Sequence, residues 1–232
     1  MILLLFDIDG TLVSTDGAGM RAFRRALQEV FDVRIDNTVI RPDGKTDPLI
    51  LREILDHFGL SEQRICDAHR EMFERYLEIL EEEMTETMQS GRIQVLPGVM
   101  NLLNALSCES DFALGLATGN LEGGAWIKLE KAGLNGFFHF GGFGSDSEDR
   151  TELTRIGIRR GTQHVSPASV HGACVFGDTP FDILHGRNAG ASVIAVASGG
   201  YGISDLQGLK PDLALADLTP TESIISFMRT RI

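Results

Sequence analysis

The chain has 232 residues, of which 43% are hydrophobic and 23% charged, and this length accommodates a catalytic domain with a smaller inserted module. Its formal net charge of −12 excludes an overall basic field of the kind that holds nucleic acid or an anionic membrane. We therefore expect a small solute as the partner, and neither nucleic acid nor a membrane. The sequence leaves the oligomeric state open between monomer and dimer.

Features that would indicate secretion or metal-bound cysteine are missing from the sequence. Cys66, Cys108 and Cys174 are widely spaced and form no CxxC pair, which predicts neither a disulfide framework nor a zinc site. Residues 1–6 are apolar but have no basic residues before them and no small-residue cleavage pattern, so we expect no signal peptide. No apolar segment approaches the length of a membrane span. The expected location is the cytoplasm.

The first predicted element is a buried strand over Ile2–Phe6, an apolar run that stops at Asp7. Apolar residues then recur at helical spacing over 19–31, 48–58 and 62–88, and polar linkers bracket this block. The expected division is a core made of residues 1–14 and 93–232 and an inserted α-helical domain over 15–92.

Helices and strands alternate in the rest of the chain, which predicts an α/β fold with a parallel sheet. Ligands of such sheets bind beyond the carboxyl ends of the strands, so Asp7, Thr118 and Asp178 are expected to converge. The expected helices span 99–106, 122–132 and 148–160, a short apolar stretch lies at 137–140, and the expected strands span 112–117, 173–176 and 192–196.

Asp7 and Asp9 are followed by Gly10, which permits a tight turn that aims both carboxylates inward. Crowded carboxylates repel one another unless a proton or a cation lies between them, and Mg²⁺ with oxygen ligands suits that need. Asp178, with Asp182 one helical turn later, would complete a set of metal ligands with Asp7 and Asp9. The structural alternatives are a calcium loop or a simple turn at the first motif, and only a helix-start role for Asp182.

This set of residues supports phosphoryl transfer. Asp7 would attack phosphorus, while Asp9 would protonate the leaving alkoxide and later activate water. Mg²⁺ would neutralise charge on the transferred group, and Thr118 with nearby backbone amides would hold phosphate oxygens. The segment Thr118-Gly119-Asn120 could equally be turn chemistry after a strand.

Three segments in order resemble the motifs of the haloacid dehalogenase-like hydrolase superfamily, and in particular its phosphoglycolate phosphatase-like members with a helical cap. They are Asp7-Ile8-Asp9-Gly10-Thr11-Leu12, Thr118-Gly119-Asn120 and Gly177-Asp178-Thr179-Pro180-Phe181-Asp182. The resemblance implies a doubly wound, Rossmann-like core with a cap inserted after the first strand. It also implies a Mg²⁺-dependent phosphatase for a small phosphorylated metabolite, phosphoglycolate-like or a sugar phosphate.

The same resemblance assigns roles to individual residues. It makes Asp7 the nucleophile, Asp9 the acid and base, and Asp178 a Mg²⁺ ligand supported by Asp182. Thr118, with Gly119 and Asn120, becomes the phosphate-binding segment.

One family residue is missing, because the usual lysine before the fourth strand has no counterpart between Lys131 and Lys210. Arg150 is our predicted substitute, since a guanidinium keeps the charge and can grip phosphate with two parallel bonds. Lys128 and Lys131, on another predicted helix, compete for this role, and the alternative for Arg150 is a solvated helix residue.

Lys45 lies in a turn of the predicted cap and would recognise an anionic or polar part of the substrate, unless it only occupies a surface turn. Three rival functions remain: a β-phosphoglucomutase-like phosphomutase, a haloacid dehalogenase and a non-catalytic phosphate-binding module. The mutase shares all the core motifs. Asp9 argues against the dehalogenase. The binding module is disfavoured by the intact set Asp7, Asp9, Thr118 and Asp178.

Overall fold

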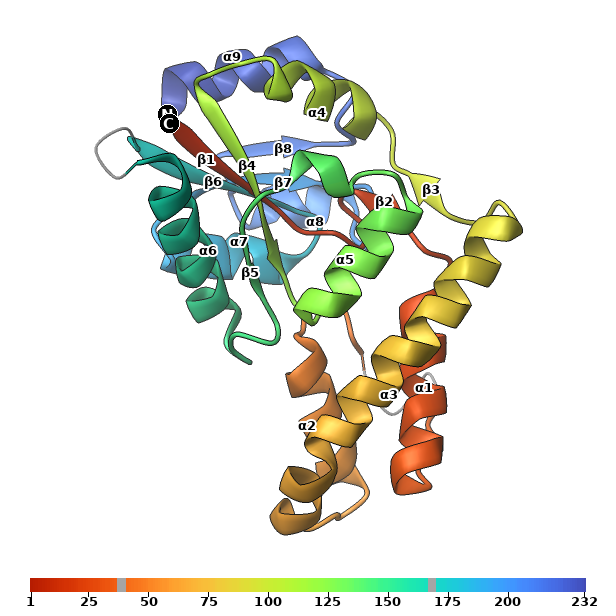
Figure 1. The fold of residues 1–232 in the computed structure, drawn as a ribbon. Helices are drawn as coiled ribbons and strands as arrows, with labels where there is room; N and C mark the ends of the chain where they lie inside the picture. The colour runs from red at the N-terminus through yellow and green to blue at the C-terminus, as the bar shows by residue number, and fades with distance from the viewer. Residues whose placement is uncertain (37–40, 167–169) are drawn as a thin grey trace.

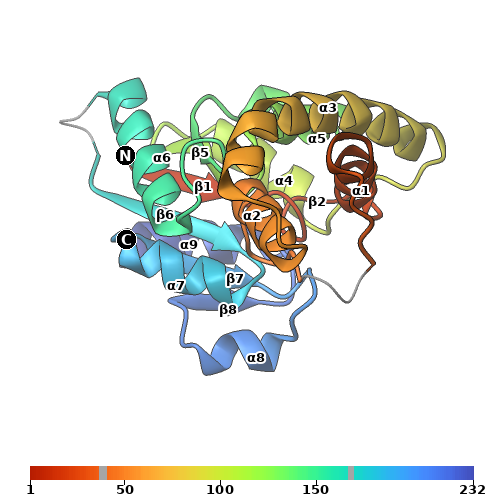
Figure 2. The ribbon, with the colours of Figure 1, turned by 90° about the horizontal axis from the view of Figure 1, so that it is seen from below.

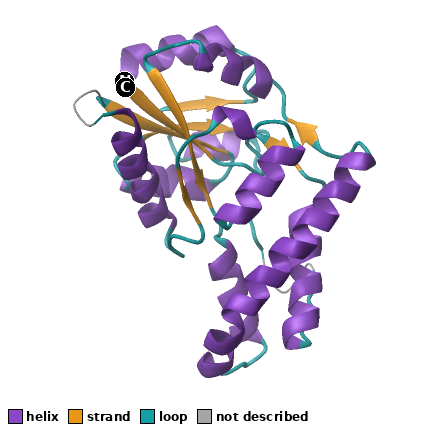
Figure 3. Cartoon of the chain, viewed as in Figure 1, coloured by secondary structure: helices purple, strands orange, loops and turns teal. Residues whose placement is uncertain are grey.

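The computed structural model describes residues 1–36, 41–166 and 170–232. An α/β core lies beside a block of long helices (Figure 1), and strands are confined to the core and to its connection with that block (Figure 3). The core sheet has six parallel strands in the order β5-β4-β1-β6-β7-β8. In that order they span Gly141–Phe143, Phe112–Thr118, Ile2–Phe6, Gly172–Gly177, Ser192–Val196 and Leu213–Leu215.

Strand β1 lies between β4 and β6 and is buried along its whole length. Its side chains alternate between the two faces of the sheet. Leu4 and Phe6 pack on one face with helices α4 (Val99–Ser107), α5 (Glu122–Lys131) and α9 (Thr221–Arg231). Leu3 and Leu5 pack on the other face, where α6 (Arg150–Val165) lies. Helices therefore cover both faces, which confirms the predicted doubly wound α/β core. The core also contains helices α7 (Pro180–Asn188) and α8 (Ile203–Gly208).

The helical block consists of α1 (Ala18–Phe31), α2 (Asp47–His57) and α3 (Glu62–Gln89). These helices share an apolar cluster of their own, and α1 runs alongside α3 (Figures 1 and 2). The chain enters the block through β2 (Val13–Ser14) and leaves it through β3 (Gln94–Val95), and these two short strands pair antiparallel. Entry and exit are thus adjacent, as an insertion into the core requires. We refer to this block as the cap.

The edge strand β5 differs most from the sequence-based expectation. The apolar stretch 137–140 contains the end of a short 3₁₀ turn, Asn135–Phe137, and the strand itself is the glycine-rich Gly141–Phe143. A side chain at Gly142 would lie 1.8 Å from the carbonyl oxygen of Leu153, because α6 packs directly against this strand. Glycine has low strand propensity, so the apolar runs used to predict strands from the sequence did not indicate β5.

Helix α6 also begins later than expected, at Arg150. Asp149 is its N-cap and accepts a hydrogen bond from the backbone N–H of Thr151 at 2.8 Å. Among the thiols, Cys108 is exposed and Cys174 buried, both outside disulfides, and the side chain of Cys66 lies outside the described part. In the described segments, no helix combines the length and the apolar character needed to cross a bilayer.

Candidate active site

Three neighbouring strands place the predicted site residues at the same end of the sheet, where the carboxyl ends of the strands lie. Asp7 follows β1, Thr118 ends β4, and Asp178 follows β6. All three line a cavity of about 320 Å³ between the core and the cap. Viewed from the cap side, α2 lies across this part of the core (Figure 2).

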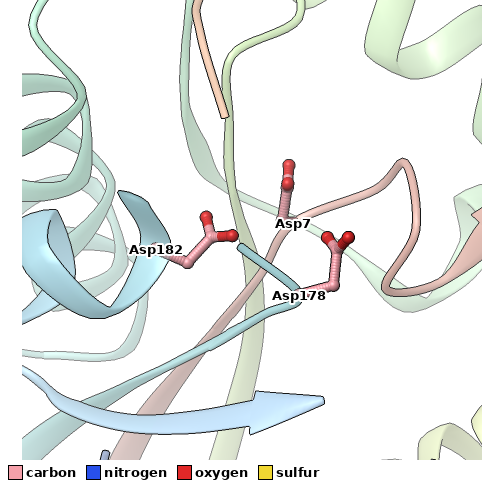
Figure 4. Close-up of side chains that lie close together, drawn as sticks. All are labelled: Asp7, Asp178 and Asp182. Atoms are coloured by element: carbon pink, nitrogen blue, oxygen red, sulfur yellow. The ribbon is translucent and has the colours of Figure 1, made fainter. Parts of the chain in front are cut away.

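Asp7, Asp178 and Asp182 form a buried carboxylate cluster around a common space (Figure 4). Each offers an oxygen atom, and these atoms lie within 4.8 Å of one another. Gly10 makes room for the cluster, because its φ is 80° and a Cβ there would lie 2.4 Å from Oδ2 of Asp178. The tight turn expected at the first motif therefore has a steric reason.

The cluster has more negative charge than its protein neighbours balance. Burial raises the pKa of Asp7, and Asp182 and Asp9 raise it further, although Arg150 opposes them. Burial also raises the pKa of Asp178, together with repulsion from Asp182 and Asp7. Hard carboxylate oxygens that are crowded and buried are a donor set that fits Mg²⁺.

Asp182 has two roles in the structure. Its Oδ2 accepts hydrogen bonds from the backbone N–H and the hydroxyl of Thr179, at 2.9 and 2.7 Å, in a capping box that begins α7. Its Oδ1 accepts from Arg150. The helix-start role and the position in the carboxylate cluster therefore both apply, and Asp182 has less free acceptor capacity for a cation than Asp7 or Asp178.

Arg150 is the cation beside the expected nucleophile. Its guanidinium is buried, pairs with Asp182, and places Nη2 3.3 Å from Oδ2 of Asp7. Burial alone would lower the pKa of Arg150, but Asp182 and Asp7 raise it above its usual value, so the side chain stays charged. Lys131, a competitor for this role, pairs with Glu81 and does not line the cavity.

The side chain of Asp9 is held apart from the carboxylate cluster. Its Oδ2 accepts hydrogen bonds from Nζ of Lys128 at 2.6 Å and from Nδ2 of Asn120 at 2.9 Å. Lys128 also donates to Oδ1 of Asn120 at 2.6 Å. The structure thus brings Asp9 and Asn120 together. From the sequence we expected Asp9 to be a metal ligand as well as the acid and base, and Asn120 to bind the phosphate group of the substrate.

Thr118 is linked to the same network. Nδ2 of Asn120 donates to Oγ1 of Thr118 at 2.8 Å, so the Thr118 hydroxyl accepts there and keeps its own hydrogen for another acceptor. Thr118 and Gly119 both line the cavity, as a phosphate-binding segment would.

Comparison with known proteins identifies the family. The family model described as haloacid dehalogenase-like hydrolase matches residues 4–196. The chain belongs to this family. The hydrolase is 27% identical over 222 residues to pyrophosphatase PpaX of Listeria innocua, covering 96% of this chain and 95% of that one. It is 28% identical over 232 residues to phosphoglycolate phosphatase of Agrobacterium fabrum, covering 97% and 94%.

Solved structures agree at the level of the fold. The hydrolase is similar to a β-phosphoglucomutase from Clostridium difficile, with a TM-score of 0.72, 18% identity, and coverage of 99% of this chain and 98% of the other. It is also similar to a hydrolase from Pseudomonas syringae, with a TM-score of 0.69, 20% identity, and coverage of 97% and 98%. The resemblance seen in the sequence motifs is confirmed.

A cap loop clasps the core of the hydrolase next to the cavity. The backbone N–H of Asp47 donates to the carbonyl of Gly119, and Oδ2 of Asp47 accepts from the backbone N–H of Leu121, both at 2.8 Å. Thr46 adds a hydrogen bond to the carbonyl of Glu148 at 3.2 Å. Sequence reasoning missed this clasp, although the pattern of Thr46 before Asp47 and Pro48 is a helix-start signal.

Burial raises the pKa of Asp47 to about 6, although Lys128 and the Leu121 N–H oppose this change. Lys45 lines the cavity, but its Nζ pairs with Oε2 of Glu53 at 2.5 Å. The predicted substrate-binding lysine therefore already has an anionic partner on α2.

Proposed function

We propose that this hydrolase is a Mg²⁺-dependent phosphatase that acts on a small phosphorylated metabolite through an aspartyl phosphate on Asp7. One observation carries the proposal. The Asp7 carboxylate lies at the carboxyl end of the central strand, faces the cavity, and shares its surroundings with a cationic Arg150 and the carboxylate of Asp178. The cavity therefore brings together a nucleophile, Asp7, a cation, Arg150, and a carboxylate able to bind a metal ion, Asp178.

The chemistry proceeds in two steps. A carboxylate oxygen of Asp7 attacks phosphorus, the bond from phosphorus to the leaving oxygen breaks, and Asp9 gives that oxygen a proton. Asp9, now a carboxylate, takes a proton from a water molecule, which attacks phosphorus and displaces Asp7. Inorganic phosphate leaves, and both aspartates return to their starting states.

Charge on the transferred group is met by residues already in place. Arg150 can donate to phosphate oxygens from beside Asp7, and Thr118 has a hydroxyl hydrogen free to do the same. Asp7 and Asp178, with Asp182 in support, would hold Mg²⁺, which when bound neutralises charge on the phosphoryl oxygens. Bound Mg²⁺ would also offset the electrostatic repulsion among the three buried carboxylates.

The dimensions of the site favour a small substrate. A volume of about 320 Å³ lies at the low end of small-molecule pockets. The cap loop closes it from one side, and apolar cap residues line part of it, including Met20, Phe23 and Ile50. The first compounds to assay are phosphoglycolate, pyrophosphate and sugar phosphates. The first two appear in the names of its relatives.

Asp7→Asn tests the mechanism, because an amide cannot form the acyl phosphate. We expect Mg²⁺-dependent release of nitrophenolate from 4-nitrophenyl phosphate to fall at least about a thousandfold, with little change in melting temperature. Asp56→Asn, at an exposed position of α2, is the matched control and should stay fully active. Full activity in Asp7→Asn would refute the nucleophile assignment. Isomerisation of a sugar phosphate with little free phosphate would show a mutase instead.

A further inference from the structure

Lys128 is a buried cation that the two-step mechanism above does not use. It lies on α5, and its side chain is 5% exposed. Its Nζ is 2.6 Å from Oδ2 of Asp9 and 2.6 Å from Oδ1 of Asn120. Burying a lysine is costly unless its ammonium has hydrogen-bond partners, and Asp9 and Asn120 both provide them.

The cap encloses this ammonium. A Cβ at Gly19 of α1 would lie 3.3 Å from Nζ of Lys128. The first turn of α1 therefore lies next to the ammonium, and the absence of a side chain at residue 19 leaves room for it. Lys128 also opposes the raised pKa of Asp47, the residue of the cap clasp. The Lys128 side chain is therefore confined between core and cap.

The hydrogen bonds divide the two oxygens of the Asp9 carboxylate. Oδ2 accepts from both Lys128 and Asn120, whereas Oδ1 accepts from no side chain or backbone group in the described part of the chain. Since Asn120 is itself held by Lys128 and Thr118, the donors to Oδ2 are fixed in place. This arrangement fixes the plane of the carboxylate and leaves Oδ1 for proton exchange.

We propose that Lys128 is a positioning residue that, together with Asn120, holds Oδ2 of Asp9 and so orients Oδ1 of Asp9 for proton transfer. The inference rests on the proposed phosphatase function. It separates the two cations of the site: Arg150 accompanies the nucleophile Asp7, and Lys128 accompanies the acid and base Asp9. Removing Lys128 should then affect proton transfer and spare the attack on phosphorus.

Leaving groups of different basicity test this separation. Nitrophenolate leaves without a proton, so its first-turnover release measures the attack by Asp7, whereas an alkyl phosphate needs the proton from Asp9. In Lys128→Met we expect nitrophenolate release in the first turnover to stay within about threefold of wild type, and the same step with an alkyl phosphate to fall at least about thirtyfold. Steady-state hydrolysis of both esters should fall, because water activation also uses Asp9. Equal losses of the first step with both esters, or no loss with the alkyl ester, would overturn the proposal.

A double-mutant comparison gives an independent readout. If Lys128 acts through Asp9, adding Lys128→Met to Asp9→Asn should change the rates by less than about twofold. A large additional loss would mean that Lys128 acts on the substrate directly. Lys128→Arg, which keeps charge and donors, should recover part of the alkyl phosphatase rate. Lys128→Gln, which keeps one neutral donor, replaces the Met variant if that one does not fold, and should show the same contrast between esters.

The controls separate this inference from the function on which it rests. Lys210→Met, beyond the end of α8 and outside the cavity, removes a lysine without touching the site and should match wild type. Wild-type protein that hydrolyses neither ester with Mg²⁺ would refute the phosphatase assignment itself. Wild-type activity with no contrast between esters in Lys128→Met would refute only the role of Lys128.

Discussion

Replacing Arg150 by Met should weaken both the fold and the reaction. The guanidinium is buried and pairs with Asp182 and Asp7, so its loss leaves two buried carboxylates facing one another. Removing one partner of a buried ion pair costs about 3–5 kcal/mol. For a chain of this size, each kcal/mol lowers the melting temperature by about 2–4 °C, so we expect a decrease of about 6–20 °C.

Mg²⁺ should change the size of this loss. A divalent ion bound at Asp7 and Asp178 would supply positive charge to the same cluster, so the decrease in melting temperature should be greater in EDTA than in MgCl₂. Turnover should fall about 10²–10³-fold, as when a group that stabilises transition-state charge is removed. Arg150→Lys should recover more of the stability than of the turnover, because an ammonium keeps the charge without the guanidinium fork.

Thermal melts with EDTA or MgCl₂ and steady-state hydrolysis of 4-nitrophenyl phosphate measure these effects. Arg159→Met is the matched control, since Arg159 is exposed on the same helix. Surface substitutions of this kind change stability by about 0.5 kcal/mol or less, so that variant should match wild type. An Arg150→Met protein that melts within about 2 °C of wild type in EDTA would refute the energetic reasoning. Unchanged turnover would refute the role beside Asp7.

Three further variants test the clasp, the metal and the pH dependence. Gly119→Ala places a methyl group 2.2 Å from the carbonyl oxygen of Lys45, so the cap loop must move away from the core. We expect kcat/KM to fall at least about tenfold, and an unchanged value would show that the clasp is dispensable. Asp178→Asn should raise the Mg²⁺ concentration for half-maximal activity at least about tenfold, and an unaltered Mg²⁺ titration would remove Asp178 from the ligand set. Burial raises the pKa of Asp47 from 3.8 to about 6, so the folded state holds this proton more tightly than the unfolded state. The resulting stability, about 3 kcal/mol, is present below about pH 4 and is lost as the pH rises through about 6. Asp47→Asn cannot ionise, so its melting temperature relative to wild type should increase between pH 4 and pH 7, and a constant difference would contradict the assignment.

Much of the core could be predicted from apolar runs. Ile2–Phe6 and Ser192–Val196 are buried strands of a parallel sheet, which appear in a sequence as short apolar segments closed by polar residues. The glycine-rich β5 gave no such signal. The short β8, only partly buried, gave none either. The three cap helices followed from their apolar periodicity, to within one or two residues at their ends.

The convergence of Asp7, Thr118 and Asp178 also followed from the sequence, because carboxyl ends of adjacent parallel strands meet at one edge. Asp182 shows the limit of such reasoning. Its two alternatives, helix start and site residue, could not be ranked from spacing, and in the structure one side chain serves both.

The sequence by itself determined the ordered aspartate motifs, the strands that carry them and the missing family lysine. Only the tertiary structure decided which cation meets which carboxylate. Arg150 lies 143 positions from Asp7, and Lys128 lies 119 positions from Asp9. Long side chains reach several ångströms in many directions, so their partners depend on how α5 and α6 pack against the sheet. That packing places Arg150 beside Asp7 and Lys128 beside Asp9.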